Sequence, residues 1–292
     1  MSVGVPKIDP IAAQNYDKTY YLRDAGGLGG YRIITESEGR EFPAYFESFW
    51  ERCEGTEGMR ILDVGCGRGE FAVFAAAKGA DVLGVDYSSE AVGIASELAR
   101  LCRKEIHARS RGRGRAAFVS SDAKALPFSD GTFDRVTSRA LLEHLHQWEL
   151  EEMLREVRRV VKPTGMAVLC TNPNLWYKKY GLHVVRLARR FLPMLDEISP
   201  EEQDSDARER DDFHVNEQSF FGLSRALEKT GFKVRTSTEP RFNFRPEVLR
   251  AKGGKWWPLL HCGLFLLERV PPSSWIFGEN ILCKGKPAGT TR

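Results

Sequence analysis

Acidic residues and a run of alternate glycines have the types and spacing that suit binding of a polar ligand. The glycines follow an apolar run in Ile61-Leu62-Asp63-Val64-Gly65-Cys66-Gly67-Arg68-Gly69-Glu70. Glycine permits positive φ angles and lets a ligand approach the main chain without a Cβ in the way. Asp86 ends a second apolar run, at the offset of about 20 residues expected for a carboxylate that accepts hydrogen bonds from ribose hydroxyls. These residues predict that a nucleoside binds where two strands end.

A further carboxylate follows a third apolar run, in Ser121-Asp122-Ala123, and could accept a hydrogen bond from an adenine amino group. The glycine turn lacks the endings of its generic alternatives, which are G-x-G-x-x-G for dinucleotides and G-K-[ST] for phosphate loops. Asp86 has an alternative role as the N-cap of a helix that starts at Ser88, because Asp and Ser both cap helices well.

Alternating strands and helices must position these residues. The hydrophobic pattern predicts helices over 71–78, 88–102, 150–161 and 217–230 and strands over 61–64, 81–86, 117–120, 133–138, 166–171, 232–237 and 280–284. A turn, Lys162-Pro163-Thr164-Gly165, is expected before the fifth strand. Strands that alternate with helices pair in parallel through right-handed crossovers, and ligands bind beyond their carboxyl ends.

The predicted fold class is α/β, with a doubly wound, Rossmann-like, mostly parallel sheet of seven strands. We expect a helical N-terminal cap over 1–55, with a helix near 42–52, and a main domain over 56–292. The main domain is expected to contain a lid insertion at about 173–216 and a second apolar insertion at about 240–275.

The order of these motifs resembles that of class I S-adenosylmethionine-dependent methyltransferases, particularly the type 11 branch that includes quinone and sugar methyltransferases. The resemblance covers roughly residues 60–240 and extends to Phe133-Asp134-Arg135-Val136-Thr137-Ser138 and Leu142-Glu143-His144-Leu145. It implies an enzyme that uses S-adenosyl-L-methionine, with no bound metal. The implied cofactor-binding residues are Asp63, Gly65, Cys66, Gly67, Gly69, Asp86, Tyr87, Asp122, Ala123, Ser138 and Arg139.

Within that resemblance, the glycine turn lies under the methionine part of the cofactor, Asp86 holds the ribose, and Asp122 with Ala123 meets adenine. Main-chain groups around Ser138 and Arg139 contact the amino acid end. Methyl transfer from a sulfonium mainly requires an aligned acceptor and the exclusion of water. His144 is the candidate general base for a hydroxyl acceptor, and the alternative is a structural histidine bonded to a backbone carbonyl. His183 and His214 are further candidates on the lid.

The insertions bear on the acceptor. Residues 175–192 show an apolar stripe among basic residues, typical of a lid helix or of a helix on an anionic membrane. An aromatic and apolar stretch over 255–267 could line the acceptor pocket or touch lipid. The expected acceptor is a small or lipid-linked molecule, most simply a hydroxyl of a sugar, glycan precursor or secondary metabolite.

Two alternatives stay open at the level of sequence. RNA is a rival acceptor, because arginines concentrate over 109–115, although a flexible charged loop is the simpler interpretation and nucleic acid is not the expected partner. Moreover, Asn172-Pro173-Asn174 follows the fifth predicted strand, whereas amino-directed nucleic-acid methyltransferases place an Asn-Pro-Pro-aromatic motif after the fourth. The other alternative is a cofactor-binding protein that has lost catalysis, because a fold alone does not prove chemistry.

Composition limits the expected partners and the expected cellular location of the protein. The formal net charge of +3 over 292 residues does not indicate a polyanion partner. The six cysteines form no C-x-x-C pair, which argues against a zinc site or a disulfide framework and favours reduced thiols in the cytoplasm. No secretory signal or membrane-spanning stretch is evident, so we expect a cytoplasmic protein, with peripheral contact at the inner face of the membrane as an option.

Overall fold

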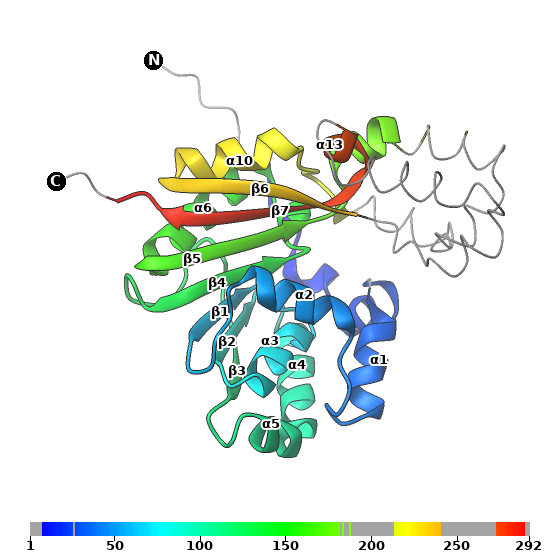
Figure 1. The fold of residues 1–292 in the computed structure, drawn as a ribbon. Coiled ribbons are helices and arrows are strands. Elements are labelled where there is room, and N and C mark those ends of the chain that lie inside the picture. The colour runs from blue at the N-terminus through cyan, green and yellow to red at the C-terminus, as the bar shows by residue number, and fades with distance from the viewer. Residues whose placement is uncertain are drawn as a thin grey trace, which may run out of the picture.

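Seven strands form one sheet in the computed structural model, in the order β3-β2-β1-β4-β5-β7-β6 (Figure 1). The structure describes residues 8–25, 27–181, 183, 187, 213–240 and 273–289. The strands are β1 (Arg60–Val64), β2 (Asp81–Asp86), β3 (Arg115–Ser120), β4 (Phe133–Arg139), β5 (Val161–Thr171), β6 (Phe232–Pro240) and β7 (Gly278–Pro287). Pairing from β3 through β5 is parallel, and β7 pairs antiparallel with both β5 and β6. The predicted α/β fold with a mostly parallel sheet is confirmed.

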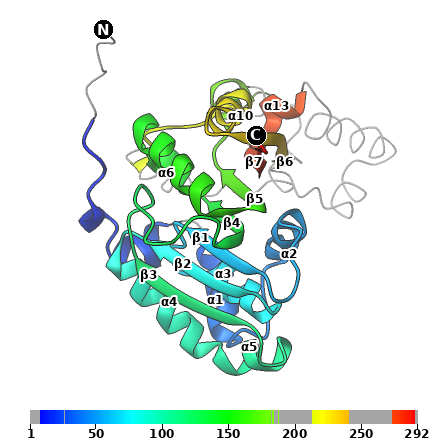
Figure 2. The same cartoon turned by 90° about the vertical axis from the view of Figure 1, so that its left-hand side faces the viewer.

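Helices cover both faces of this sheet (Figures 1 and 2). The main helices are α1 (Leu28–Glu36), α2 (Ala44–Arg52), α3 (Glu70–Ala77), α4 (Ser89–Leu101), α5 (Arg103–Arg109), α6 (Gln147–Val160), α10 (Phe220–Lys229) and α13 (Ser273–Phe277). Short helical turns are η1 (Ala13–Asn15), η2 (Tyr20–Asp24), η3 (Leu142–His144) and η4 (Tyr177–Gly181). None of the helices in these ranges is both long and apolar enough to span a bilayer.

The alternation of side chains along the strands separates two hydrophobic cores. In β1, Ile61 packs into the core under α2 and α3, whereas Leu62 packs into the core under α6 and α10. Successive side chains of a strand point to opposite faces, so a strand covered on both sides must be apolar at consecutive positions. The polar exceptions in β1 and β4 are therefore conspicuous, and Asp63 and Thr137 form a buried pair that is described below.

The order of the strands reverses beside β1, which lies between β2 and β4. The chain first builds outward from β1 to β3 and then returns to add β4 and β5 on the other side. Such a reversal opens a crevice at the carboxyl ends of the strands, because the crossovers on its two sides leave toward opposite faces. The glycine turn after β1 and the loop after β4 border that position.

Two local expectations need correction. Helix α5 occupies 103–109, where no helix was expected, and its only buried residue is Ile106, whereas 110–114 form a turn before β3. Strand β5 begins at Val161, so the expected turn at Lys162-Pro163-Thr164-Gly165 lies within the strand. The partner of Phe133 is Val161, but the partner of Arg135 is Met166, which identifies the turn residues as a bulge.

The insertions lie mostly outside the described residues. The predicted helix over 175–192 begins with helical residues that include η4, but 182, 184–186 and 188–192 lie outside the described residues. Most of the predicted lid over 173–216 also lies outside the described residues, and so does the apolar stretch 255–267. The predicted cap helix near 42–52 is present as α2.

Candidate functional site

The glycine turn is fixed against the end of the neighbouring strand. The amides of Gly65 and Cys66 both donate to the carbonyl of Val85, at N···O distances of 2.8 and 3.0 Å. Gly65, Gly67 and Gly69 have φ angles of 69°, 50° and 79°. These angles lie in the left-handed region that favours glycine, so the sequence pattern is a direct consequence of the turn's shape.

Replacing Gly69 with alanine should destabilise the protein. A Cβ at Gly69 would lie 2.8 Å from both the Cβ of Ala95 and the ring of Phe118. The strained φ and the crowding together should lower the free energy of unfolding by about 2 to 5 kcal/mol. Gly93→Ala is the matched control, because that exposed position in α4 is open, and alanine should stabilise it by up to about 1 kcal/mol. Urea denaturation measures both, and equal stability of the two variants would contradict this account.

Asp86 ties the glycine turn to the next loop. Its Oδ2 accepts from the amide of Gly67 at 3.0 Å, and its Oδ1 accepts from the amide of Ser88 at 3.0 Å and from the hydroxyl of Tyr21 at 3.4 Å. Burial raises the pKa of this carboxyl, and the hydrogen bonds from Ser88, Gly67 and Tyr21 oppose that shift. The N-cap of α4 is Ser88, whose Oγ accepts from the amide of Ala91, so Asp86 is not the cap.

An N-terminal segment, residues 8–25, packs over this end of β2. The hydroxyl of Ser88 donates to the carbonyl of Tyr16 at 2.7 Å, and the phenol of Tyr87 donates to the carbonyl of Ile11. On the other side, the buried guanidinium of Arg68 donates to the carbonyl of Tyr21 at 2.8 Å. The segment therefore covers the Asp86 carboxylate. Sequence reasoning placed an aromatic cap here but missed the contact of Tyr21 with Asp86, for which the sequence holds no specific signal.

Asp63 is buried below the turn, where its Oδ1 accepts from the hydroxyl of Thr137 at 2.8 Å. Burial raises the pKa of Asp63 to about 7, although Thr137 and the nearby charge of Arg139 act in the opposite direction. A carboxyl with that pKa is largely protonated in the folded protein at mildly acidic pH, where the unfolded chain is already ionised. Asp63 therefore favours folding most at low pH, and this contribution is lost as the pH rises toward 7.

The variant Asp63→Asn should reveal this dependence. The amide keeps an oxygen for Thr137 but does not titrate. Relative to the parent protein, the variant should gain stability as pH rises from about 4 to 7, and the difference should stay constant above that range. Guanidinium denaturation of both proteins across this range measures the effect. A difference that does not change with pH would show that Asp63 is not the titrating group.

Two side chains at the end of β4, Ser138 and Arg139, hold polar atoms without partners in the described part of the chain. Ser138 Oγ, Arg139 Nη1 and Asn216 Nδ2 are buried and have no hydrogen-bond partner among the described residues. The guanidinium of Arg139 stacks over the ring of Phe49, 4.8 Å from its centroid, and also faces Phe46 and Tyr45 of α2. Burying such donors without acceptors is costly, so this arrangement is suited to an anionic ligand.

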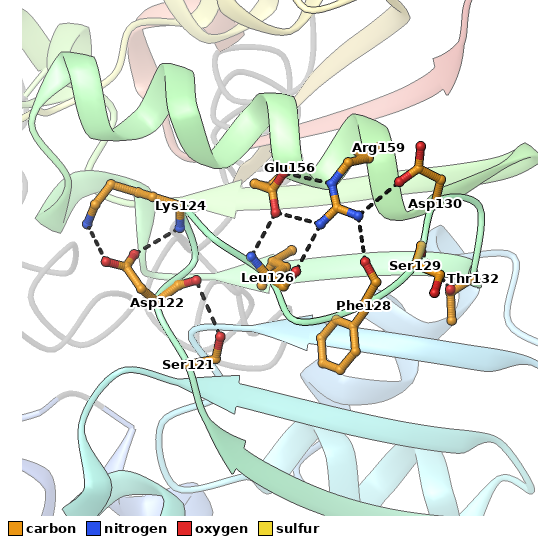
Figure 3. A network of polar contacts seen from close by, with 10 residues as sticks. All are labelled: Ser121, Asp122, Lys124, Leu126, Phe128, Ser129, Asp130, Thr132, Glu156 and Arg159. Atoms are coloured by element: carbon orange, nitrogen blue, oxygen red, sulfur yellow. Dashed lines mark hydrogen bonds and ion pairs between the residues drawn. The ribbon is translucent and has the colours of Figure 1, made fainter.

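Asp122 lies on a loop that α6 holds in place (Figure 3). Arg159 of α6 donates to the carbonyls of Leu126 and Phe128, and Glu156 accepts from the amide of Leu126 at 2.7 Å. The half-exposed Asp122 pairs with Lys124, both through the main-chain amide at 2.9 Å and through Nζ at 3.0 Å. The half-buried Ala123 follows, and the loop stands at the carboxyl end of β3 as expected.

His144 lies in η3, where its Nδ1 is 3.3 Å from the hydroxyl of Tyr16 and its ring is 5.0 Å from that of His214. Burial lowers the pKa of His144 to about 3, and His214 adds a smaller effect in the same direction. A hydrogen bond with the main chain of Phe213 acts in the opposite direction. His183 is exposed. Sequence reasoning picked out His144 and His214 separately but missed the buried Glu143 beside them, although an acid next to a candidate base is a usable signal.

These features fit the groups of S-adenosylmethionine. Asp86 offers a buried acceptor for ribose hydroxyls, and Arg139 offers an unpaired donor for a carboxylate. A Cβ at Gly67 would meet only the ring of Tyr21, at 3.8 Å, so space is open above the turn. Asp86 and Arg139 lie at the ends of β2 and β4, on either side of β1. One acceptor and one donor thus lie on opposite sides of β1.

Comparison with known proteins finds similarity to methyltransferases. Residues 61–165 match the family described as methyltransferase domain. Methyltransferase GfsG of Streptomyces halstedii is 34% identical over 121 residues, which are 41% of this chain and 40% of that protein. Demethylmenaquinone methyltransferase of Clavibacter sepedonicus is 35% identical over 113 residues, 39% of this chain and 41% of that protein. The chain spans about half or less of the length of these two relatives.

A solved structure shares the fold. A TehB-like SAM-dependent methyltransferase from Corynebacterium glutamicum superposes with a TM-score of 0.51 at 15% identity, covering 94% of this chain and 97% of that one. At that identity the likeness supports the fold alone. Together with the family match and the relatives, it identifies residues 61–165 as a methyltransferase domain within this α/β fold.

Proposed function

We propose that this protein transfers the methyl group of S-adenosylmethionine to a hydroxyl of a small-molecule or lipid-linked acceptor, such as a sugar, a glycan precursor or a secondary metabolite. The observation that carries the proposal is the pairing of the Asp86 carboxylate with the glycine turn, beside the unpaired Arg139 guanidinium. Relatives whose names denote small-molecule chemistry, such as the demethylmenaquinone methyltransferase, favour a small acceptor.

In this proposal each part of the cofactor has its own residues. Asp86 accepts from the ribose hydroxyls, with Tyr87 beside it, and Asp122 with Ala123 meets adenine. The methionine part lies over the glycine turn, from Gly65 through Cys66 and Gly67 to Gly69. Ser138 and Arg139 bind its amino acid end, and Asp63 accepts from Thr137 below the turn. The Arg139 side chain, and not only the main chain, pairs with the carboxylate.

The transfer itself is an in-line displacement. The acceptor oxygen attacks the methyl carbon, the carbon–sulfur bond breaks, and sulfur keeps its electron pair. The protein's contribution is alignment and exclusion of water. The 1–55 cap is proposed to close over the cofactor, because its residues 8–25 already cover Asp86. His144 stays the candidate base, but an imidazole with a pKa of about 3 accepts a proton weakly at neutral pH.

The cellular location of the protein is also part of the proposal. We propose a cytoplasmic protein, with peripheral membrane contact through 175–192 or 255–267 as the alternative that a lipid-linked acceptor would require. The cysteines at 53, 66, 102, 170 and 283 are buried and form no disulfide with one another, which is compatible with a reducing compartment. RNA is disfavoured as an acceptor, because Arg109 pairs with Glu105 and Arg113 with Glu57, which leaves less free positive charge in the basic stretch.

Labelled methyl transfer tests the proposal. The full chain is incubated with S-adenosylmethionine that carries an isotopically labelled methyl group and with a panel of sugars, hydroxylated aromatics, lipid-linked glycans and RNA. We expect S-adenosylhomocysteine to form together with one labelled small or lipid-linked product whose methyl group is on oxygen. Label in RNA alone would replace this proposal by the RNA alternative. Cofactor binding with no transfer to any acceptor on the panel would favour the catalytically silent alternative.

A further inference from the structure

Three potential metal ligands meet near the carboxyl ends of β4 and β5. One donor atom each from Glu143, His144 and His214 lies within 4.8 Å of the other two. Glu143 and His144 belong to η3, directly after the loop that follows β4, whereas His214 comes from 70 residues further along the chain. Two imidazoles and one carboxylate form a mixed donor set that binds zinc and other divalent transition metals in proteins.

Glu143 is a buried acid that is not paired with a cationic side chain in the described ranges. Its side chain is fully buried, and its carboxylate accepts from the hydroxyl of Thr171 at 2.8 Å and from the amide of Asn172 at 3.4 Å. Within the described ranges it forms no ion pair with a lysine or arginine. A buried carboxylate without a cationic partner is costly, and hydrogen bonds from a hydroxyl and an amide orient it without neutralising it.

The chain itself holds the third ligand in place. The amide of Asn216 donates to the carbonyl of Glu143 at 3.1 Å, and the main chain of Phe213 hydrogen-bonds the ring of His144. His214 lies between these two anchors, and its ring meets that of His144 edge to face. The segment 213–216 is thus attached to η3 on both sides of His214, so only small shifts are needed to bring the donors together.

We propose that Glu143, His144 and His214 bind one divalent transition-metal cation that holds the acceptor oxygen at the carboxyl ends of β4 and β5. A tetrahedral site with bonds of about 2.1 Å requires donor separations of about 3.4 Å, so donors that lie up to 4.8 Å apart must close by at most about 1.4 Å. The ring of His144 already has two hydrogen-bond neighbours, Tyr16 and Phe213. A cation would displace one of them, and the other would orient the ring. Magnesium is disfavoured, because it prefers oxygen ligands.

The site also narrows the acceptor class, and this part rests on the proposed function. Three protein ligands leave one open position in a tetrahedral site and two when it expands to five-coordination, so the preferred acceptor has a hydroxyl next to a second oxygen donor. In this arrangement His144 is a ligand and no longer the candidate base. The bound hydroxyl releases its proton to water, and its oxygen then forms the bond to the methyl carbon. The carbon–sulfur bond breaks, and its electron pair stays on sulfur in S-adenosylhomocysteine. No external oxidant or reductant is needed.

Cobalt titration tests the site without any turnover. Chelator-stripped full-length protein is titrated with Co²⁺, which reports His and carboxylate coordination by visible absorption, and bound Co²⁺ is then displaced with Zn²⁺. We expect one equivalent per chain. His214→Ala should weaken binding at least about 100-fold, since even the loss of an outer hydrogen bond to a ligand costs about 10- to 100-fold. His107→Ala is the matched control, because His107 is an exposed histidine of α5, and it should bind like the parent protein.

Specific outcomes would overturn the proposal. These are the absence of Co²⁺ and Zn²⁺ binding at millimolar metal, unchanged binding by His214→Ala, or equal displacement of Co²⁺ by Mg²⁺. Glu143→Gln provides a second test of the same ligand set and should also weaken Co²⁺ binding if the variant folds. Calorimetry with S-adenosylhomocysteine separates the two proposals: if the protein binds this ligand but no metal, only the metal site fails. Metal binding without methyl transfer to any acceptor would instead refute the proposed function.

Discussion

Asp86→Ala should weaken binding of S-adenosylhomocysteine at least about 100-fold. The carboxylate is buried between the glycine turn and the N-terminal segment, and in the proposed function it accepts from the hydroxyls of a ribose. Each hydrogen bond to a charged group contributes about 1.5 to 3 kcal/mol, and two of them correspond to about two or more factors of ten in affinity. Isothermal titration calorimetry of the folded variant measures the change.

Two further variants make this result interpretable. Asp86→Asn keeps one acceptor oxygen for the amides of Gly67 and Ser88, so it should fold normally and lose part of the affinity. Asp81→Ala changes a half-exposed aspartate at the other end of β2 and should bind the ligand like the parent protein. Unchanged affinity in a folded Asp86→Ala variant would contradict the proposed ribose contact.

Arg139→Leu should reduce affinity for S-adenosylhomocysteine by about 10- to 100-fold while leaving affinity for adenosine unchanged. Leucine retains apolar contact with Phe49 and Phe46, but it removes the buried nitrogen that has no partner in the described structure. The loss corresponds to one charge-assisted pair with the carboxylate of the amino acid end. Adenosine lacks that carboxylate, so it reports on the rest of the pocket.

The comparison of two ligands is the control for the Arg139 variant. Calorimetry with adenosine and with S-adenosylhomocysteine on the same protein preparation removes differences in folding. Loss of affinity for both ligands to the same extent would mean that Arg139 supports the pocket through packing on α2 and not through the carboxylate. Asp86→Ala, in contrast to Arg139→Leu, should weaken binding of both ligands, because both carry the ribose.

The sequence predicted the sheet and the position of Asp86 because both depend on local patterns. A buried parallel strand must be apolar at consecutive positions, and a turn with positive φ requires glycine, so residues 61–69 are recognisable without a structure. The carboxylate at Asp86 follows from its place at the end of β2. Residues 103–109 gave no such signal, because a short helix with one buried side chain, Ile106, has too little periodicity.

The parts of the site that sequence reasoning missed depend on contacts between distant segments. Tyr21 reaches Asp86 from 65 residues away, and the segment of His214 reaches Glu143 from the far end of the lid insertion. Proline and glycine at 163 and 165 predicted a turn, but pairing with β4 kept the chain in the sheet as a bulge. Tertiary contacts of this kind override local propensity, and the spacing of the residues along the chain does not predict them.

Calorimetric titration of the unmodified protein with S-adenosylmethionine and S-adenosylhomocysteine tests the central claim most directly. We predict that both ligands bind at one site per chain and that the product form binds without any acceptor present. Heat changes that stay at the level of dilution up to millimolar ligand would contradict the claim that the crevice beside β1 is a cofactor site.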